Sequence, residues 1–163
     1  MPALARHSGG GVIFFTLIVA FVLTVIPMPE WLAYARPEWV ALCLMYWCIA
    51  LPQRVGVGTA WISGLFLDVL RGALLGQHAL ALAIVAYLAL LLHQRIRVNP
   101  VWQQSLSVLV LVTIYQIFVL WVNGIIGKPS ANWTSWLPSL SSMLMWPLVF
   151  VTLRSLRRGF GVT

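Results

Sequence analysis

The chain has 163 residues, of which 61% are hydrophobic and only 8% are charged, and its formal net charge is +7. Soluble globular domains are typically about 45–50% apolar and about 25% charged, so this composition, with a mean hydropathy of +0.95, excludes that class and predicts an integral membrane protein. We expect one membrane domain over residues 1–163 and no separate soluble catalytic domain, because the spans need nearly all of this length.

Six apolar segments follow one another along the chain, and we predict that each forms a transmembrane helix. They cover residues 11–27, 38–51, 55–70, 76–92, 101–122 and 137–153. A spanning helix usually takes about 17–25 residues, so the shorter segments require local bilayer thinning, apolar flanks counted into the helix, or a re-entrant second segment. The first segment ends in Pro27-Met28-Pro29 without a small-residue cleavage site, which indicates an anchor rather than a removed signal peptide.

The basic residues divide unevenly between the two sides that six spans define. One side carries Arg6, Arg54, Arg95, Arg97, Arg154, Arg157 and Arg158, and the other carries Arg36, Arg71 and Lys128. Short cytoplasmic loops retain Lys and Arg, so this bias predicts that both termini are cytoplasmic. The same bias explains the positive net charge by membrane insertion, which argues against a nucleic-acid partner.

The C-terminal arginines Arg154, Arg157 and Arg158 fall on one helical face. We expect them to contact anionic membrane lipid on the cytoplasmic side, with an acidic cytosolic partner as the alternative.

The third segment carries a stripe of small residues that ends in a carboxylate. Gly56, Ala60, Gly64 and Asp68 lie four residues apart and therefore share one face of a helix. Small residues at this spacing let a second helix backbone approach closely, which is how helices associate in lipid. We predict that the stripe packs against another helix, of this chain or of a partner, and that Gly72 and Gly76 form the tight external turn that follows.

Asp68 is the only carboxylate beyond the first residue of a predicted span, and it needs a partner there. Arg71, three residues further on, lies on the same helical face, and Arg36 belongs to the same external side. We therefore expect a structural ion pair of Asp68 with Arg71 or Arg36, which fixes the register of the small-residue stripe against the helix that it packs on. Direct use of Asp68 in a protein or lipid interface, and an ion or solute site, are the alternatives. Gln116 in the fifth segment is expected to hydrogen-bond between helices.

The polar residues of the spans do not form a pattern that predicts catalysis or metal binding. His7, His78 and His93 lack the three- or four-residue spacing that places two imidazoles on one helical face, so we expect no metal and no cofactor. Ser63 and His78 lie at different depths, and Asp68 has no second carboxylate beyond the first residue of a span, so intramembrane protease chemistry is not expected. We predict that the protein is not an enzyme.

The block from Arg36-Pro37-Glu38-Trp39 to Leu80 is similar to the MreD family of bacterial rod shape-determining proteins. Its most specific parts are Arg-Pro-x-Trp at the start of the second segment, Leu-Pro-x-Arg-Val at residues 51–55, and the run Gly64, Asp68, Gly72 and Gly76. The resemblance extends over nearly the whole chain and agrees with its length, six-span hydropathy and basic C-terminus.

This resemblance implies a non-enzymatic subunit of the bacterial inner membrane, in the machinery that elongates the rod-shaped cell wall. MreD-like proteins associate with MreC, a single-span membrane protein, and through it with the actin-like MreB filament and the peptidoglycan synthases. The family also resembles in fold the six-helix substrate-binding (S) subunits of energy-coupling-factor transporters. Association of two copies is left open.

A solute-binding S-type subunit of a membrane transporter is the alternative function. In S subunits an Ala-x-x-x-Ala pair on the first helix docks the coupling protein, and the first segment here, GVIFFTLIVAFVLTVIP, has no such pair. A solute pocket also needs several convergent polar groups, and the spans carry few. Both observations favour an assembly subunit.

Overall fold

The computed structural model describes residues 10–27, 29–30, 36–52, 55–72, 74–127 and 136–159 of the chain. These residues form six helices and no strand: α1 (Gly10–Val25), α3 (Trp39–Ala50), α4 (Val57–Arg71), α5 (Gln77–Val98), α6 (Val101–Ile125) and α7 (Leu137–Gly159). Each helix overlaps one of the six apolar segments, so the prediction of an all-helical protein is confirmed for this part of the chain. Arg6, Arg54 and Lys128, which entered the prediction of orientation, lie outside it.

Three of the helices, α5, α6 and α7, are long and apolar enough to cross a membrane, and α1 and α3 are shorter apolar helices. Together with the composition they indicate a membrane protein; that all six helices span the bilayer stays a prediction. α5 and α7 end at Val98 and Gly159, beyond the predicted residues 92 and 153. Both extensions carry arginines, which favour helix and keep their charge in water while the stem packs along the helix.

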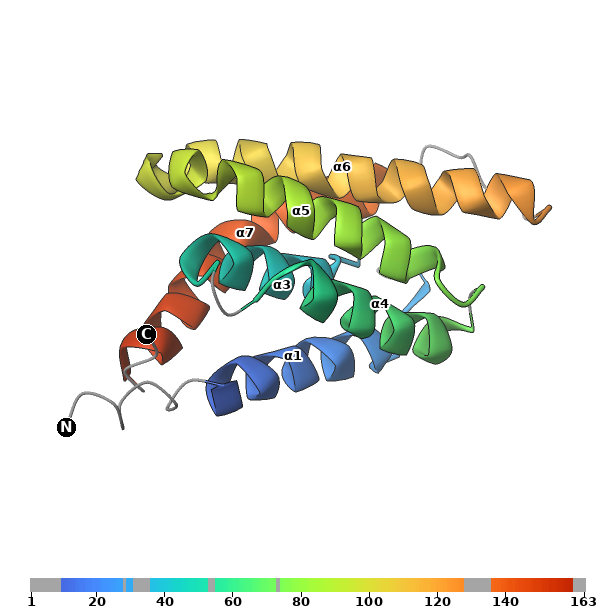
Figure 1. Cartoon of the computed structure of the whole chain (residues 1–163), viewed down its shortest axis with the longest axis horizontal. Helices are drawn as coiled ribbons and strands as arrows, with labels where there is room; N and C mark the ends of the chain where they lie inside the picture. Colours follow the sequence, from blue (N-terminus) through green and yellow to red (C-terminus); the bar gives the residue numbers. More distant parts are fainter. Residues whose placement is uncertain are drawn as a thin grey trace.

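α3 lies at the centre of the bundle, where α1, α5 and α7 pack around it (Figure 1). Every residue from Val40 to Ala50 is buried, which is typical of a helix that is apolar on all sides. With 12 residues, α3 is about 18 Å long, much shorter than the roughly 30 Å hydrocarbon core of a bilayer. Its flanking residues Glu38 and Leu51 are also buried. Both ends of α3 therefore lie away from water.

The other helices follow one another around this centre. α4 packs on α5, α5 on α6, and α6 on α7. Their outward faces carry exposed large apolar side chains such as Phe66, Val110 and Leu144. Exposed apolar side chains on several helices are expected where a protein meets lipid tails.

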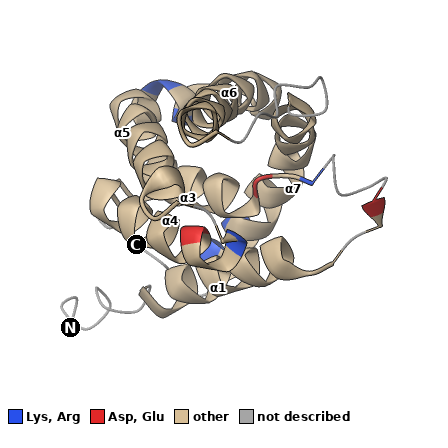
Figure 2. Cartoon of the chain, turned by 90° about the vertical axis from the view of Figure 1, so that its right-hand side faces the viewer, with Lys and Arg blue, Asp and Glu red and all other residues tan. Residues whose placement is uncertain are grey.

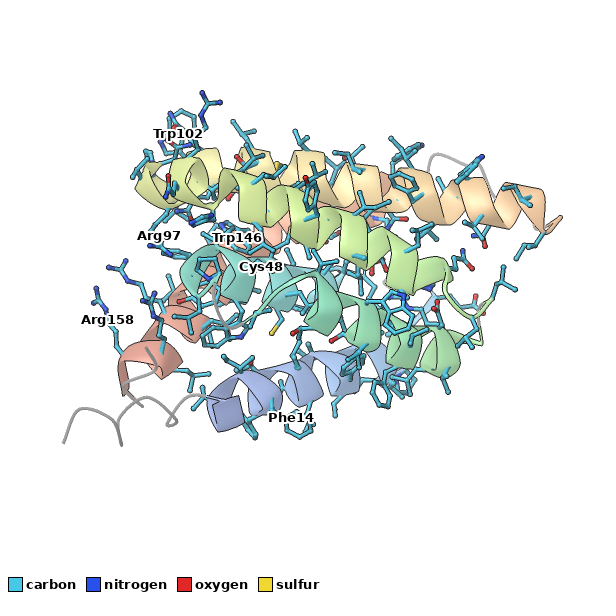
Figure 3. All side chains as sticks on the ribbon, viewed as in Figure 1. Phe14, Cys48, Arg97, Trp102, Trp146 and Arg158 are labelled. Atoms are coloured by element: carbon cyan, nitrogen blue, oxygen red, sulfur yellow. The ribbon has the colours of Figure 1, made fainter. Side chains whose placement is uncertain are left out.

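The helices alternate in direction, and the two ends of the bundle differ in charge. We name the end that holds Gly10 of α1 and Gly159 of α7 the basic end (Figures 1 and 3). The arginines in the last turns of α5 and α7 lie there, namely Arg95, Arg97, Arg157 and Arg158, with Arg154 about one turn before them. The opposite end, which faces the viewer in Figure 2, we name the acidic end. It holds Glu38, Asp68, Arg36 and Arg71.

Gly64 lies where α4 meets α5. A Cβ atom at Gly64 would come within 2.3 Å of the Cα of Ala79 and 2.8 Å of the carbonyl oxygen of His78. Ala60, one turn earlier on the same face, is fully buried, whereas a Cβ at Gly56 would meet nothing within 4 Å. The small-residue stripe thus serves packing inside the chain at Gly64, and Gly56 lies outside that contact.

A short turn between α4 and α5 depends on two glycines. Gly72 ends α4 with a φ of +64°, and Gly76 precedes α5 with a φ of +100°. Residues with a Cβ rarely adopt these left-handed conformations. The prediction of a tight turn at these positions is confirmed. The turn returns the chain so that the first turn of α5 lies beside Asp68 in the last turns of α4.

We predict that Gly64→Ala destabilises the protein, because the added methyl group meets backbone atoms of α5 that cannot rotate away. Overpacking of this kind costs about 1–3 kcal/mol in the free energy of unfolding. Gly58→Ala is the matched control, since Gly58 is on the same helix and a Cβ there meets nothing within 4 Å. Thermal unfolding of the detergent-purified variants measures both; equal effects at the two positions would contradict the close contact.

Candidate functional site

Polar side chains from five parts of the chain meet at the acidic end and form one connected group, which we name the polar cluster. Its members are Glu38, Asp68, Arg71, His78, Gln116 and Ser142. All but Arg71 are buried, and the side chain of Arg71 is 29% exposed. Charged groups taken out of water are costly unless they are paired and hydrogen-bonded, so the connections within the cluster decide whether this end is stable.

Glu38, directly before α3, joins this helix to three others. Its Oε2 accepts a hydrogen bond from the guanidinium of Arg71 on α4 at 3.1 Å, which makes an ion pair, and its Oε1 accepts one from Gln116 on α6 at 3.1 Å. Its backbone N–H donates to the hydroxyl of Ser142 on α7 at 2.9 Å. The prediction that Gln116 hydrogen-bonds between helices is confirmed.

Asp68 on α4 caps the start of α5. Its carboxylate accepts hydrogen bonds from the backbone N–H groups of Gly76 and His78, both at 2.8 Å, and from Nδ1 of His78 at 2.7 Å. N–H groups in the first turn of a helix have no partner within the helix, and the helix dipole favours a negative charge there. Asp68 therefore stabilises the junction of the two helices.

The expected ion pair of Asp68 with Arg71 is wrong. Arg71 pairs with Glu38, and Asp68 is occupied by the first turn of α5. The spacing rule assumes that the only nearby groups are those on the same helix face. Here the glycine turn brings unpaired N–H groups of the next helix to Asp68, and they satisfy the carboxylate instead.

Arg36 caps the end of α1 and does not pair with Asp68 either. Its guanidinium donates to the carbonyl oxygens of Thr24 and Ile26 at 2.5 and 2.6 Å. The last carbonyl groups of a helix lack partners within it, so a cation at this position satisfies them and suits the helix dipole. The Arg-Pro-x-Trp motif thus places one side chain on α1 while Glu38, two residues later, joins α3 to the polar cluster.

Two side chains satisfy helix ends at the basic end. Arg97 on α5 donates to the last two carbonyl groups of α3 at 2.7 and 2.9 Å. Gln104 on α6 donates to the carbonyl of Ile96 at 3.0 Å, and its own carbonyl accepts from the indole N–H of buried Trp146 at 3.3 Å. At both ends of the bundle, side chains from neighbouring helices therefore bond to backbone groups at helix ends.

His78 is engaged through both ring nitrogens. Nδ1 lies 2.7 Å from Asp68, and Nε2 lies 3.3 Å from a guanidinium nitrogen of Arg71. Arginine only donates, so Nε2 accepts and Nδ1 carries the hydrogen that Asp68 accepts. A general base must present a ring nitrogen to the group that it deprotonates, and here that nitrogen faces Arg71. Asp68 and His78 therefore have the contacts of a structural pair.

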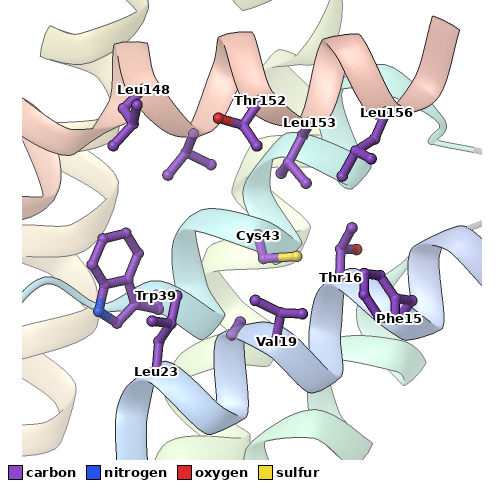
Figure 4. Close-up of a pocket in the computed structure, with 12 residues that line it drawn as sticks. Phe15, Thr16, Val19, Leu23, Trp39, Cys43, Leu148, Thr152, Leu153 and Leu156 are labelled. Atoms are coloured by element: carbon purple, nitrogen blue, oxygen red, sulfur yellow. The ribbon is translucent and has the colours of Figure 1, made fainter. Parts of the chain in front are cut away.

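Two apolar grooves flank α1. The first, of about 300 Å³, lies between α1 and α7 with α3 as its floor (Figure 4). The second, of about 460 Å³, lies between α1 and α4, and Ser63 lines it beside apolar side chains such as Ile18 and Phe66. Such linings suit hydrocarbon better than a polar solute, which needs convergent polar groups.

The three C-terminal arginines end α7 at the basic end. The guanidinium of Arg154 lies over the ring of Phe150, 5.7 Å from its centroid, whereas Arg157 is half-buried and Arg158 is exposed. Arg154 thus lies against its own helix, and Arg158 extends from this end of the bundle (Figure 3).

Sequence reasoning does not find the roles of Glu38, Ser142 and Arg97. The signal for Glu38 is a carboxylate directly before an apolar segment, but its partners are 33, 78 and 104 residues away in the chain. From the sequence, Arg97 is only one of the basic residues that predict the orientation of the chain. Its hydrogen-bond partners in α3 are 47 and 48 residues away in the chain. Contacts of such long range follow only from the packing of the helices.

The fold defines an integral membrane protein whose buried polar side chains join helix ends across the bundle. The chain matches the family of rod shape-determining proteins MreD over residues 6–156. It is also 33% identical, over 141 residues, to the rod shape-determining protein MreD of Haemophilus influenzae, an alignment that covers 86% of this chain and 87% of that relative. The chain belongs to the MreD family. No solved structure matches it significantly, so the likeness in fold to S subunits stays a prediction.

We predict that Glu38 and Arg71 are energetically coupled. In a double-mutant cycle, Glu38→Gln and Arg71→Gln should interact by about 0.5–3 kcal/mol in the free energy of unfolding, because each single change leaves the other partner without its counter-ion. Glu38→Gln with Arg97→Gln is the control, since Arg97 acts at the opposite end and should be additive within about 0.5 kcal/mol. Additivity of the first pair in detergent unfolding experiments would contradict the ion pair.

Proposed function

We propose that the chain is a non-enzymatic integral membrane subunit of the cell-wall elongation (rod) complex. It binds an MreC-like single-span membrane protein and helps to maintain rod shape and to organise peptidoglycan synthesis. Its links to an actin-like MreB filament and to the peptidoglycan synthases are indirect. The observation that carries this proposal is membership of the MreD family over residues 6–156.

The contacts of the polar cluster support a role without chemistry. The carboxylates of Glu38 and Asp68 and both ring nitrogens of His78 are engaged in bonds between helices. A catalytic group has to reach a substrate, and these groups are directed at other helices of the chain. The apolar linings of both grooves likewise favour assembly over the alternative, a solute-binding transport subunit.

The charge difference between the two ends supports the proposed topology. Four arginines in the last turns of α5 and α7 lie at the basic end, which also holds the start of α1. Lys and Arg are retained on the cytoplasmic side, so we place both termini in the cytoplasm and the chain in the bacterial inner membrane. The proposed arrangement is six spans in the manner of the S subunits.

A partner helix would meet α4 on the side away from α5, because Gly64 is already covered by Ala79. On that side Trp61, Phe66 and Val69 are exposed. Since small residues and matching apolar surfaces drive helix association in lipid, this exposed face is the place to search for the partner.

We predict that the tagged full-length chain, purified in mild detergent from its native membrane, recovers an MreC-like single-span protein near one to one. Mass spectrometry of the proteins and small molecules in the sample provides the measurement. Depletion of the chain should also round rod-shaped cells. Recovery of an ATPase-linked coupling protein or of a stoichiometric metabolite would instead establish the transport alternative.

A photo-crosslinking residue at Phe66 tests where the partner binds, and Val110 is its control. Both positions are exposed, on α4 and α6 respectively. Crosslinks from Phe66 and none from Val110 would place the partner against α4. Crosslinks from Val110 and none from Phe66 would reject the α4 face as the binding site. The proposed function itself would then still be tested by the co-purification.

A further inference from the structure

α4 is much shorter than the two long helices that follow it. It begins at Val57 and ends at Arg71, and its 15 residues rise about 23 Å. α5 and α6 have 22 and 25 residues, which correspond to about 33 and 38 Å. The hydrocarbon core of a bilayer is roughly 30 Å thick. α5 and α6 are therefore long enough to cross it, whereas α4 crosses it only where the core is thinner.

The sequence before α4 explains why this helix begins late. Pro52 has no backbone N–H to donate, and Gly56 and Gly58 are poor helix formers. The helix starts at Val57, and its N-cap, Gly56, has no side chain that could bond to the first N–H groups. Val57 and Gly58 are also exposed on the surface of the bundle. A helix start of this kind is costly in hydrocarbon and is stable in water or among lipid headgroups.

Contacts between the helices place this start near the middle of α5. Gly64 of α4 lies against Ala79 of α5, and the two helices run in opposite directions from the short turn that joins them. Val57 comes seven residues before Gly64. Seven residues after Ala79 is Ala86, so Val57 lies about opposite Ala86. α5 continues for 12 residues beyond that level to Val98, a rise of about 18 Å (Figure 1).

The same level can be found on α6, at the other side of α5. Gln77 donates a hydrogen bond to the carbonyl oxygen of Val119 at 3.0 Å, and α5 and α6 also run in opposite directions. Ala86 comes nine residues after Gln77. The matching level on α6 lies nine residues before Val119, at Val110. Val57 and Val110 are therefore two exposed residues at about the same level of the bundle, one at a helix start and one within a long helix.

Exposed tryptophans differ between the two helices in the same sense. On α6, Trp102 and Trp121 are both exposed and 19 residues apart, which is about 28 Å along the helix. Tryptophan is enriched at the two membrane–water interfaces, and this spacing matches a bilayer of ordinary thickness. On α4, Trp61 is exposed about one turn after the helix begins. An interface near the start of α4 would suit this indole as well as the helix start.

We propose that the bilayer is indented from its basic side beside α4, so that water and lipid headgroups reach Val57. The same level on α6, at Val110, lies within hydrocarbon. α4 then meets a hydrocarbon layer of about 20 Å, the length that its exposed apolar side chains cover from Val57 to Leu70. A bilayer thins beside an apolar surface shorter than its core at a modest cost per ångström.

This interaction with lipid goes beyond the proposed function, because it needs no protein partner. A partner helix on the exposed face of α4 would lie in the same thinned layer.

Labelling of single cysteines in lipid vesicles tests the proposal. The full-length chain is reconstituted alone in dioleoyl-phosphatidylcholine, and Val57→Cys and Val110→Cys are treated with a charged, water-soluble maleimide on both sides of the membrane. Because a thiol reacts as the thiolate, which forms in water, we expect Val57→Cys to react on the order of tenfold faster or more. Cys43 and Cys48 are buried, and the unsubstituted chain measures their background.

Two further exposed positions serve as controls. Val98→Cys, at the basic end of α5, should react as fast as Val57→Cys. Phe66→Cys, further along α4, should react as slowly as Val110→Cys, because lipid tails cover it. Thermal unfolding checks that each variant is folded. If Val57→Cys does not fold, Gly58→Cys takes its place, since a Cβ at Gly58 meets nothing within 4 Å.

Lysine at the two matched positions provides an independent measurement. Val57→Lys should leave the yield of folded protein and its melting temperature in lipid nanodiscs unchanged, because the ammonium group lies among headgroups. Val110→Lys should lower both, because a charge near the bilayer centre is costly.

Three results would overturn the proposal. Equally slow labelling of Val57→Cys and Val110→Cys would show that hydrocarbon covers both positions. Fast labelling of Phe66→Cys would show a water-filled cleft along α4 in place of a thinned bilayer. Equal losses with lysine at the two positions would show that they lie equally deep in hydrocarbon. None of these results depends on an MreC-like protein, so the co-purification tests the proposed function separately.

Discussion

The backbone groups at the ends of α3 are the constraint on which the rest of the structure depends. α3 is about 18 Å long and buried along its length, so water is not there to bind the N–H groups at its start or the carbonyl groups at its end. An unpaired backbone group in such surroundings costs several kcal/mol. Ser142 of α7 accepts from the N–H of Glu38, and Arg97 of α5 donates to the last carbonyls. The central helix is stable only when its neighbours are in place.

The same requirement explains why the buried charged side chains connect helices. Asp68 accepts hydrogen bonds from the backbone N–H groups at the start of α5, and Arg36 donates to the carbonyl groups at the end of α1. Glu38 then neutralises Arg71, whose charge is only partly exposed. Because each of these bonds crosses from one helix to another, the loss of one side chain loosens two helices at once. Polar contacts thereby fix the register of helices whose apolar surfaces would pack in several ways.

Much of the fold follows from local sequence, and much of the polar cluster does not. The apolar segments predict the helices, and Gly72 and Gly76 predict the turn, because hydropathy and left-handed backbone are properties of neighbouring residues. The spacing of Asp68 and Arg71 predicts an ion pair that does not form. Spacing within one helix takes no account of the N–H groups that the next helix brings to Asp68, nor of Glu38, which is 33 residues away from Arg71.

The outward faces of the helices are largely apolar, and the polar cluster lies in the interior of the bundle. α1 shows this most clearly, because it packs chiefly on α3 and has an apolar groove on either side. Hydrocarbon or a matching helix can cover such a surface, whereas a polar solute would find few groups to bind. Apart from the cap that Arg36 provides, α1 is held to α3 mainly by packing and by one hydrogen bond, from Trp47 to Thr16. What covers the flanks of α1 therefore contributes to its stability.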